Sequence, residues 1–354
     1  MIEPAAARGA APQGREARPG GIRLAVAVSG VVGLALAIGL LLYSGLPAVL
    51  RLLMLAGWPL LWIVPAHLVP VALDAVGWRA LLPGERRAGL SFLVWVAAVR
   101  DSINALLPVA RVGGEVAAVR LLVLRGVGGV RASASVLVEV TITLFTQLVF
   151  ALVGLGLLFA ALHDHATARL LLAGLVASVP VIALFVLVQR RWGLAQLVER
   201  VLAAVAGRAV LGRVADPARL DAAVSELYRH PGALARCAVW QLAGLCAGAG
   251  ELWLTLYLLG HPATIAAAVA VESLTQAVQS AAFVVPAGLG TQEGSFLLLG
   301  AATGLSPDLA LALALARRGR QLGFGIPMLL SWQGVEGSRI GRWLAGRSRP
   351  GDQD

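Results

Sequence analysis

Long apolar runs dominate this sequence and most constrain how the chain folds. Several of them reach the roughly 20 residues that a helix needs to cross a bilayer. Only 14% of the 354 residues are charged, whereas a soluble domain carries about 25%. The alternation of apolar and polar residues that is typical of an outer-membrane barrel is absent from the sequence. The sequence therefore predicts an all-α integral membrane protein.

The apolar runs divide into complete spans and two broken regions. The predicted spans are 24–43, 52–76, 135–161, 169–188, 234–259 and 309–332. Two further apolar regions, 90–125 and 264–303, each carry a proline near the middle, Pro108 and Pro286. A cleavable signal peptide is the rival interpretation of the first span. That run is longer than a signal h-region and no A-x-A site follows it, so we expect an uncleaved span.

The positive charge of the chain predicts its orientation. The net charge is +10, the chain has no lysine, and the arginines cluster between apolar runs. Such clusters face the cytoplasm of bacterial inner-membrane proteins. We therefore expect a disordered cytoplasmic N-terminus (1–21), a basic cytoplasmic loop (189–231) and a cytoplasmic tail (334–354), which separate a first membrane half (22–188) from a second (232–333). Both termini are then cytoplasmic.

A repeat relates the two broken regions. A shift of 178 residues aligns Ser102 with Ser280, Pro108 with Pro286, Glu115 with Glu293, Leu121 with Leu299 and Gly126 with Gly304. The arginine distribution places 90–125 and 264–303 in opposite orientations, each as a re-entrant hairpin. This predicts about six transmembrane helices plus two re-entrant hairpins as an inverted repeat. In the alternative, the PAGLG stretch joins two complete spans; 294–302 is short for a span, so this alternative requires a strongly thinned bilayer or fusion of 294–302 with the following helix.

Other function classes find little support in the sequence. The basic charge lies in loops, and no separate basic module with interleaved aromatic residues indicates nucleic-acid binding. Cys237 and Cys246 lie on opposite faces of one helix and cannot pair within it. No spacing typical of a metal site occurs, and no nucleophile elbow, phosphate loop or dinucleotide motif. We expect no metal, no cofactor and no enzymatic activity.

The two motifs resemble those of a known family. NALLPVARVGGEVAAVRLLVLRG and VPAGLGTQEGSFLLLGAATGLSPDLALALALARRGRQ are similar to the lysylphosphatidylglycerol synthase transmembrane family of flippase-like proteins. AAFVVPAGLGTQEG and LALALARR resemble its hopanoid-biosynthesis-associated branch. The first motif departs from the commoner proline-glycine-arginine form. The soluble synthase domain of lysyl-lipid producers does not follow in this chain, so the resemblance implies lipid handling rather than lipid synthesis.

Polar residues at membrane depth are the candidates for that work. Each charged group there costs at least about 2.5–3.5 kcal/mol, so it normally faces protein or water. The residues predicted to bind a polar headgroup are Glu115, Glu293, Arg317, Pro286, Gly288, Gly290, Glu139, Gln147, Glu272, Gln276 and Arg111. A structural alternative is open for Glu115 and Glu293, which favour the starts of half-helices through the helix dipole. Thr291 is the expected N-cap of the second half-helix, and Arg100 with Asp101 forms either a local charge pair or part of the site.

Three functions remain open from the sequence. The first is a lipid translocator whose broken helices line a central groove for the headgroup. The second is an accessory subunit that docks a lipid-biosynthesis enzyme on 189–231, and the third is a membrane-embedded transferase. The lipid and the oligomeric state stay undetermined.

Overall fold

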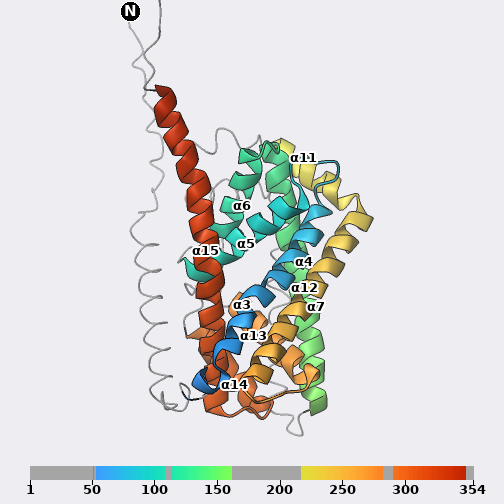
Figure 1. Cartoon of the computed structure of the whole chain (residues 1–354). Helices are drawn as coiled ribbons and strands as arrows, with labels where there is room; N and C mark the ends of the chain where they lie inside the picture. Colours follow the sequence, from blue (N-terminus) through green and yellow to red (C-terminus); the bar gives the residue numbers. More distant parts are fainter. Residues whose placement is uncertain (1–50, 52, 108–112, 162–216, 282–289, 348–354) are drawn as a thin grey trace, which may run out of the picture.

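A computed structural model describes residues 51, 53–107, 113–161, 217–281 and 290–347, and this part of the chain is all-helical (Figure 1). The helices are η1 (Trp58–Trp62), α3 (Ile63–Ala66), α4 (Leu68–Arg79), α5 (Leu90–Leu106), α6 (Gly113–Leu124), α7 (Gly129–Ala161), α11 (Pro217–Tyr228), α12 (Pro231–Leu258), α13 (Ile265–Ala281), α14 (Thr291–Ala302) and α15 (Pro307–Arg347). The prediction of an all-α membrane protein is confirmed.

Three helical segments within the described residues are long and apolar enough to cross a membrane: Trp58–Arg79, Gly129–Ala160 and Pro231–Leu258. They match the predicted spans 52–76, 135–161 and 234–259, with ends shifted by several residues. The predicted span 309–332 lies inside α15, whose first half carries several arginines. The predicted spans 24–43 and 169–188 lie outside the described residues, so the count of six stays a prediction.

The two broken regions have the same build. Helices α5 and α6 contain 17 and 12 residues, and α13 and α14 contain 17 and 12 as well. A helix of 12 residues is about 18 Å long, well short of the roughly 30 Å hydrocarbon core. We call α5–α6 the first hairpin and α13–α14 the second hairpin. Leu107 ends α5 in an extended conformation, as expected for a residue that precedes a proline.

Each hairpin packs against a long helix of the other membrane half. The first hairpin lies against the second half through α5 and α15, the second hairpin lies against the first half through α13 and α7, and α4 packs on α12. Figure 1 shows α6 toward one end of the molecule and α14 toward the other. One apolar cluster contains Trp78, Leu93 and Leu122 around the first hairpin, and a second contains Leu256 and Phe296 around the second hairpin.

Small residues let α4 and α12 approach each other closely. A Cβ atom on Gly77 would lie 3.0 Å from the Cys237 carbonyl oxygen, and one on Gly244 would lie 3.3 Å from the Pro70 carbonyl oxygen. Close backbone approach supplies the van der Waals contact that holds helices together in lipid.

Cys237 is buried, Cys246 is exposed, and both are free thiols.

The segment Trp58–Arg79 is an interrupted helix. It begins as a 3-10 helix, continues as α3, and passes through His67 into α4. Pro65 and Pro70 flank this point, and a proline removes one backbone donor from a helix. The His67 side chain at this point is mostly buried.

Candidate functional site

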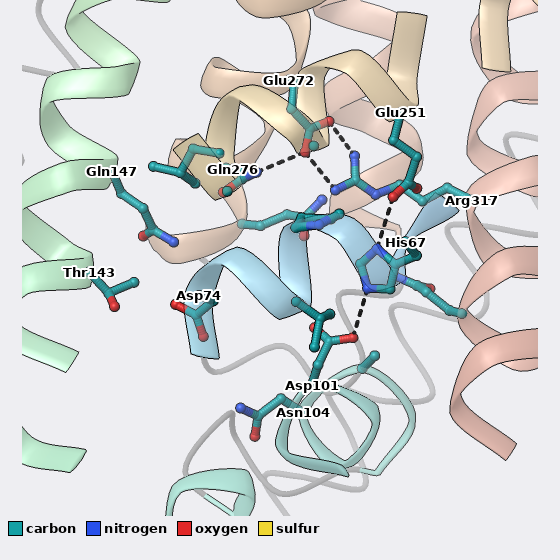
Figure 2. A pocket seen from close by; sticks show the side chains of 18 of the residues that line it. His67, Asp74, Asp101, Asn104, Thr143, Gln147, Glu251, Glu272, Gln276 and Arg317 are labelled. Atoms are coloured by element: carbon teal, nitrogen blue, oxygen red, sulfur yellow. Dashed lines mark hydrogen bonds and ion pairs between the residues drawn. The ribbon is translucent and has the colours of Figure 1, made fainter. Parts of the chain in front are cut away.

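A polar cavity of about 390 Å³ lies between the two hairpins. Helices α3, α4, α7, α12 and α15 contribute residues to its wall, as do both hairpins (Figure 2). Its charged lining residues are His67, Asp74, Arg100, Asp101, Glu115, Glu139, Glu251, Glu272, Arg317 and Arg320. Glutamines complete much of the polar wall. Because charged groups at membrane depth are costly unless they are paired or wet, the pairing of these residues decides what the cavity can hold.

One guanidinium lies among three carboxylates at the first hairpin. Arg100 on α5 donates from Nη1 and Nη2 to the two carboxylate oxygens of Glu139 on α7, at 2.5 and 2.8 Å. Arg100 Nη2 also donates to Asp74 Oδ2 on α4 at 2.5 Å. Arg100 Nη1 lies 3.5 Å from Glu115 Oε2 on α6. We call these four residues the Arg100 cluster; if all are ionised, three negative charges face one positive charge.

Polar side chains extend the Arg100 cluster across the cavity. Gln241 on α12 is buried and donates from Nε2 to Thr143 Oγ1 at 2.8 Å. The Asn104 side chain accepts from the Gly114 amide at 3.0 Å, which fixes α6 to α5. Gln147 Oε1 accepts from the Ser280 hydroxyl at 3.0 Å, so the first half contacts the second hairpin directly.

At the second hairpin the charges pair one to one. Arg317 on α15 donates from Nη1 and Nη2 to Glu272 on α13, at 2.6 and 2.8 Å. Glu272 is 1% exposed and also accepts from Gln276 Nε2 at 2.8 Å. Figure 2 shows this pair on the cavity wall above His67. Arg320 Nε lies 2.9 Å from Glu251 Oε1 on α12.

Glu293 both caps a helix and pairs with an arginine. Its Oε2 accepts from the Gly290 amide at 2.8 Å, and its Oε1 accepts from Arg318 Nε at 3.2 Å. The prediction that Thr291 is the N-cap of α14 is wrong, because Gly290 occupies that position with φ 76°. This left-handed conformation suits glycine, which has no Cβ atom. Glu115 likewise lies in the first turn of α6.

His67 joins elements of both halves. Its Nε2 lies 3.2 Å from Asp101 Oδ2 on α5, and its Nδ1 lies 2.9 Å from Glu251 Oε2 on α12. Arg320 Nη1 on α15 also contacts Nδ1. Asp101 thus contacts His67, whereas Arg100 pairs with the carboxylates of the Arg100 cluster. The interpretation of Arg100 and Asp101 as a local charge pair did not predict these contacts.

The structure brings together a majority of the predicted residues. The cavity wall contains Glu115, Glu139, Gln147, Glu272, Gln276 and Arg317. Gly290 and Glu293 lie in the second hairpin but are not among the lining residues. Arg111, Pro286 and Gly288 lie outside the described residues. That any of these residues binds a headgroup stays a prediction.

The sequence interpretation missed several residues of the site, among them His67, Asp74, Gln241 and Glu251. The sequence did contain a signal for these residues: each is polar or ionisable and lies inside a predicted apolar span, where such residues mark functional sites. Among the described residues, no group of histidine, cysteine, aspartate and glutamate side chains is arranged to hold a metal ion.

Fold and site together define an integral membrane protein with an ion-paired polar cavity between two hairpins. The chain matches the family described as the lysylphosphatidylglycerol synthase TM region over residues 30–328. The protein belongs to this family, which is a membrane domain tied to lipid modification or flipping. The resemblance seen in the two motifs is therefore confirmed at the level of the family. Comparisons with curated proteins and with solved structures gave no match.

Proposed function

We propose that this protein translocates a lipid or lipid-linked headgroup across the bacterial inner membrane. The headgroup passes through the cavity while the acyl or polycyclic tail stays in the bilayer. The observation that carries the proposal is the cavity itself, whose polar wall is built from both hairpins and held by ion pairs such as Arg100–Glu139 and Arg317–Glu272. Charged side chains that line an interior cavity at membrane depth commonly mark the pathway of a polar substrate.

The proposal includes an inverted repeat. Support comes from the equal lengths of the two hairpins and from their crosswise packing on α15 and α7. Glu139 and Arg317, which are 178 positions apart, each pair with the first helix of the hairpin in their own half. In transporters built this way, the substrate site lies near the bilayer midplane between the repeats. Both termini are then cytoplasmic, and a hopanoid-related lipid is one candidate substrate.

The proposal is tested with the full-length protein in phosphatidylcholine vesicles. The vesicles carry a trace of NBD-labelled phosphatidylglycerol or NBD-labelled phosphatidylethanolamine, and dithionite bleaches label that reaches the outer leaflet. We expect the protein to expose inner-leaflet label faster than protein-free vesicles do. Lipids extracted from the purified protein are identified by mass spectrometry, and a labelled form of any enriched lipid is assayed in the same way.

A matched pair of variants links this activity to the cavity. Gln147→Leu replaces a polar wall residue without leaving a charge, and we expect translocation to fall about tenfold, which corresponds to one lost polar contact. Leu298→Ala is the control, because Leu298 is 76% exposed on the outer face of α14. Equal rates for Gln147→Leu and the parent, or no acceleration of any lipid by the parent, contradict the proposal.

A further inference from the structure

His67 lies between two prolines in the helical segment Trp58–Arg79. Residues Ile63–Ala66 and Leu68–Arg79 are separate helices that meet at His67, and prolines lie two residues before it and three residues after it. The His67 side chain is 12% exposed and forms part of the cavity wall. It is thus a titratable group at a proline-flanked interruption, in contact with the cavity.

The groups around His67 come from three packed elements. Asp101 on α5 faces Nε2, whereas Glu251 on α12 and Arg320 on α15 both face Nδ1. Phe324 on α15 contacts the ring edge-on, with centroids 4.9 Å apart. Further charge near Glu251 comes from Arg317, and Asp74 lies two turns along α4.

The contacts at Nδ1 exclude each other. A neutral imidazole has one donor and one acceptor nitrogen, whereas an imidazolium has two donors. With Nε2–H donated to Asp101, a neutral His67 accepts at Nδ1 from Arg320, because a guanidinium only donates. A protonated His67 donates from Nδ1 to Glu251, because an ionised carboxylate only accepts. The two arrangements differ by one proton.

We propose that His67 is a proton-binding site of the cavity and that its protonation moves the Nδ1 contact from Arg320 to Glu251. The bridge Asp101–His67–Glu251 then ties the first hairpin to α12, and loss of the proton returns His67 to α15. This inference rests on the proposed function, to which it adds a proton dependence. Histidine suits such a switch because its charge changes near neutral pH.

The proton site is tested by NMR on the full-length protein with ¹³C-labelled histidine. The chain has five histidines, and His67→Gln assigns the His67 signal. We expect this signal to change from that of an imidazolium at acidic pH to that of a neutral imidazole at basic pH. Glu251→Gln should move the midpoint to lower pH by roughly one unit, because a carboxylate that favours the imidazolium is gone. Arg320→Gln should move it to higher pH, because a competing cation is gone.

The titration includes a control variant and a second variant that replaces Glu251→Gln if that protein does not fold. His261→Gln changes an exposed histidine outside the cavity and should leave the His67 midpoint unchanged. If Glu251→Gln does not fold, Asp101→Asn replaces it, since the Asp101 side chain is 48% exposed; it should also lower the midpoint. A His67 signal with one protonation state throughout, or shifts of the same sign in Glu251→Gln and Arg320→Gln, overturns the proposal.

The link to translocation is measured separately. The dithionite assay is run between pH 5.5 and 7.5 with NBD-labelled phosphatidylglycerol and phosphatidylethanolamine. We expect a pH-dependent rate for the parent and a flat profile for His67→Gln. Equal profiles overturn the coupling and leave the translocation function standing. If the parent moves no lipid, the proposed function fails, and the NMR titration alone still decides whether His67 binds the proton.

Discussion

The two halves of the cavity balance their charges differently. In the Arg100 cluster three carboxylates share one guanidinium. At the second hairpin Glu251, Glu272 and Glu293 pair with Arg320, Arg317 and Arg318, one carboxylate to each guanidinium. A shift of 178 residues relates Glu115 to Glu293, which are both carboxylates, but relates Glu139 on α7 to Arg317 on α15, which have opposite charges. The Arg100 cluster therefore has excess negative charge, whereas the three pairs near the second hairpin are balanced.

This difference shows that the two long helices, α7 and α15, carry opposite charges, each in an ion pair with a hairpin helix. Arg100 on α5 pairs with a glutamate on α7, and Glu272 on α13 pairs with an arginine on α15. Each pair ties the first helix of a hairpin to the long helix of its own half. Because one long helix then carries a glutamate and the other an arginine, the cavity has an acidic side and a balanced side.

The largest expected effect comes from removing a guanidinium. Loss of one partner from a buried ion pair costs about 3–5 kcal/mol, because the remaining charge is uncompensated. Arg100→Gln leaves three carboxylates without their shared partner, whereas Arg317→Gln leaves Glu272, which still accepts from Gln276. We expect Arg100→Gln to lower the free energy of unfolding more than Arg317→Gln. Denaturant unfolding in detergent, followed by circular dichroism, measures both.

Double variants sharpen this comparison. Glu272→Gln with Arg317→Gln removes both charges of a one-to-one pair and should restore most of the lost stability. Glu139→Gln with Arg100→Gln leaves two carboxylates and should restore only part. Equal recovery in the two double variants would show that the halves do not differ in charge balance.

A middle-sized effect is expected from glycines in the two hairpins. A Cβ atom on Gly114 in α6 would lie 2.6 Å from the Arg100 carbonyl oxygen, whereas one on Gly294 in α14 meets no atom within 4 Å. Gly114→Ala should therefore cost about 1–3 kcal/mol through overpacking. Gly294→Ala should be neutral or stabilising by up to about 1 kcal/mol, because alanine favours helix. Thermal unfolding of the two variants compares them, and a harmless Gly114→Ala would mean that α5 and α6 do not pack this closely.

The smallest effect is expected from the carboxylates that begin the half-helices. Glu293→Gln keeps an acceptor oxygen for the Gly290 amide or for Arg318, and Arg318 also donates to Gln321, so its cost should stay near the value of about 1 kcal/mol that is typical of a charge at a helix end. Glu115→Gln removes one of the excess carboxylates of the Arg100 cluster, so its effect should stay within about 0.5 kcal/mol. Differential scanning calorimetry measures both changes. A larger loss of stability in Glu115→Gln than in Glu293→Gln would contradict the excess of carboxylates in the Arg100 cluster.

The sequence predicted the helices and the hairpin breaks because these depend on local features. Apolar runs and a proline such as Pro108 are visible without knowledge of the neighbours. Glu139, Glu272 and Arg317 were singled out as polar residues at membrane depth, and all three line the cavity. That Glu139 pairs with Arg100 and Glu272 with Arg317 was not predicted, because the crossing of a hairpin helix over a long helix depends on tertiary packing.

The remaining differences have the same physical origin. His67 and Glu251 are 184 positions apart in the sequence, so periodicity cannot bring them together. The N-cap of α14 was placed at Thr291 from residue preference, whereas the backbone places it at Gly290, whose positive φ depends on the turn that precedes the helix. Local preference predicts where a helix begins only to within a residue or two.

The central claim is that the two hairpins enter the membrane from opposite sides. Gly128 between α6 and α7 and Ser306 between α14 and α15 occupy matching positions, 178 residues apart, and both are exposed. Single cysteines are placed at these positions after Cys237→Ala and Cys246→Ala, and intact cells are treated with an impermeant maleimide. The account predicts that Ser306→Cys reacts in intact cells and Gly128→Cys reacts only after permeabilisation. Reaction of both from the same side would contradict the inverted repeat and the shared cavity built on it.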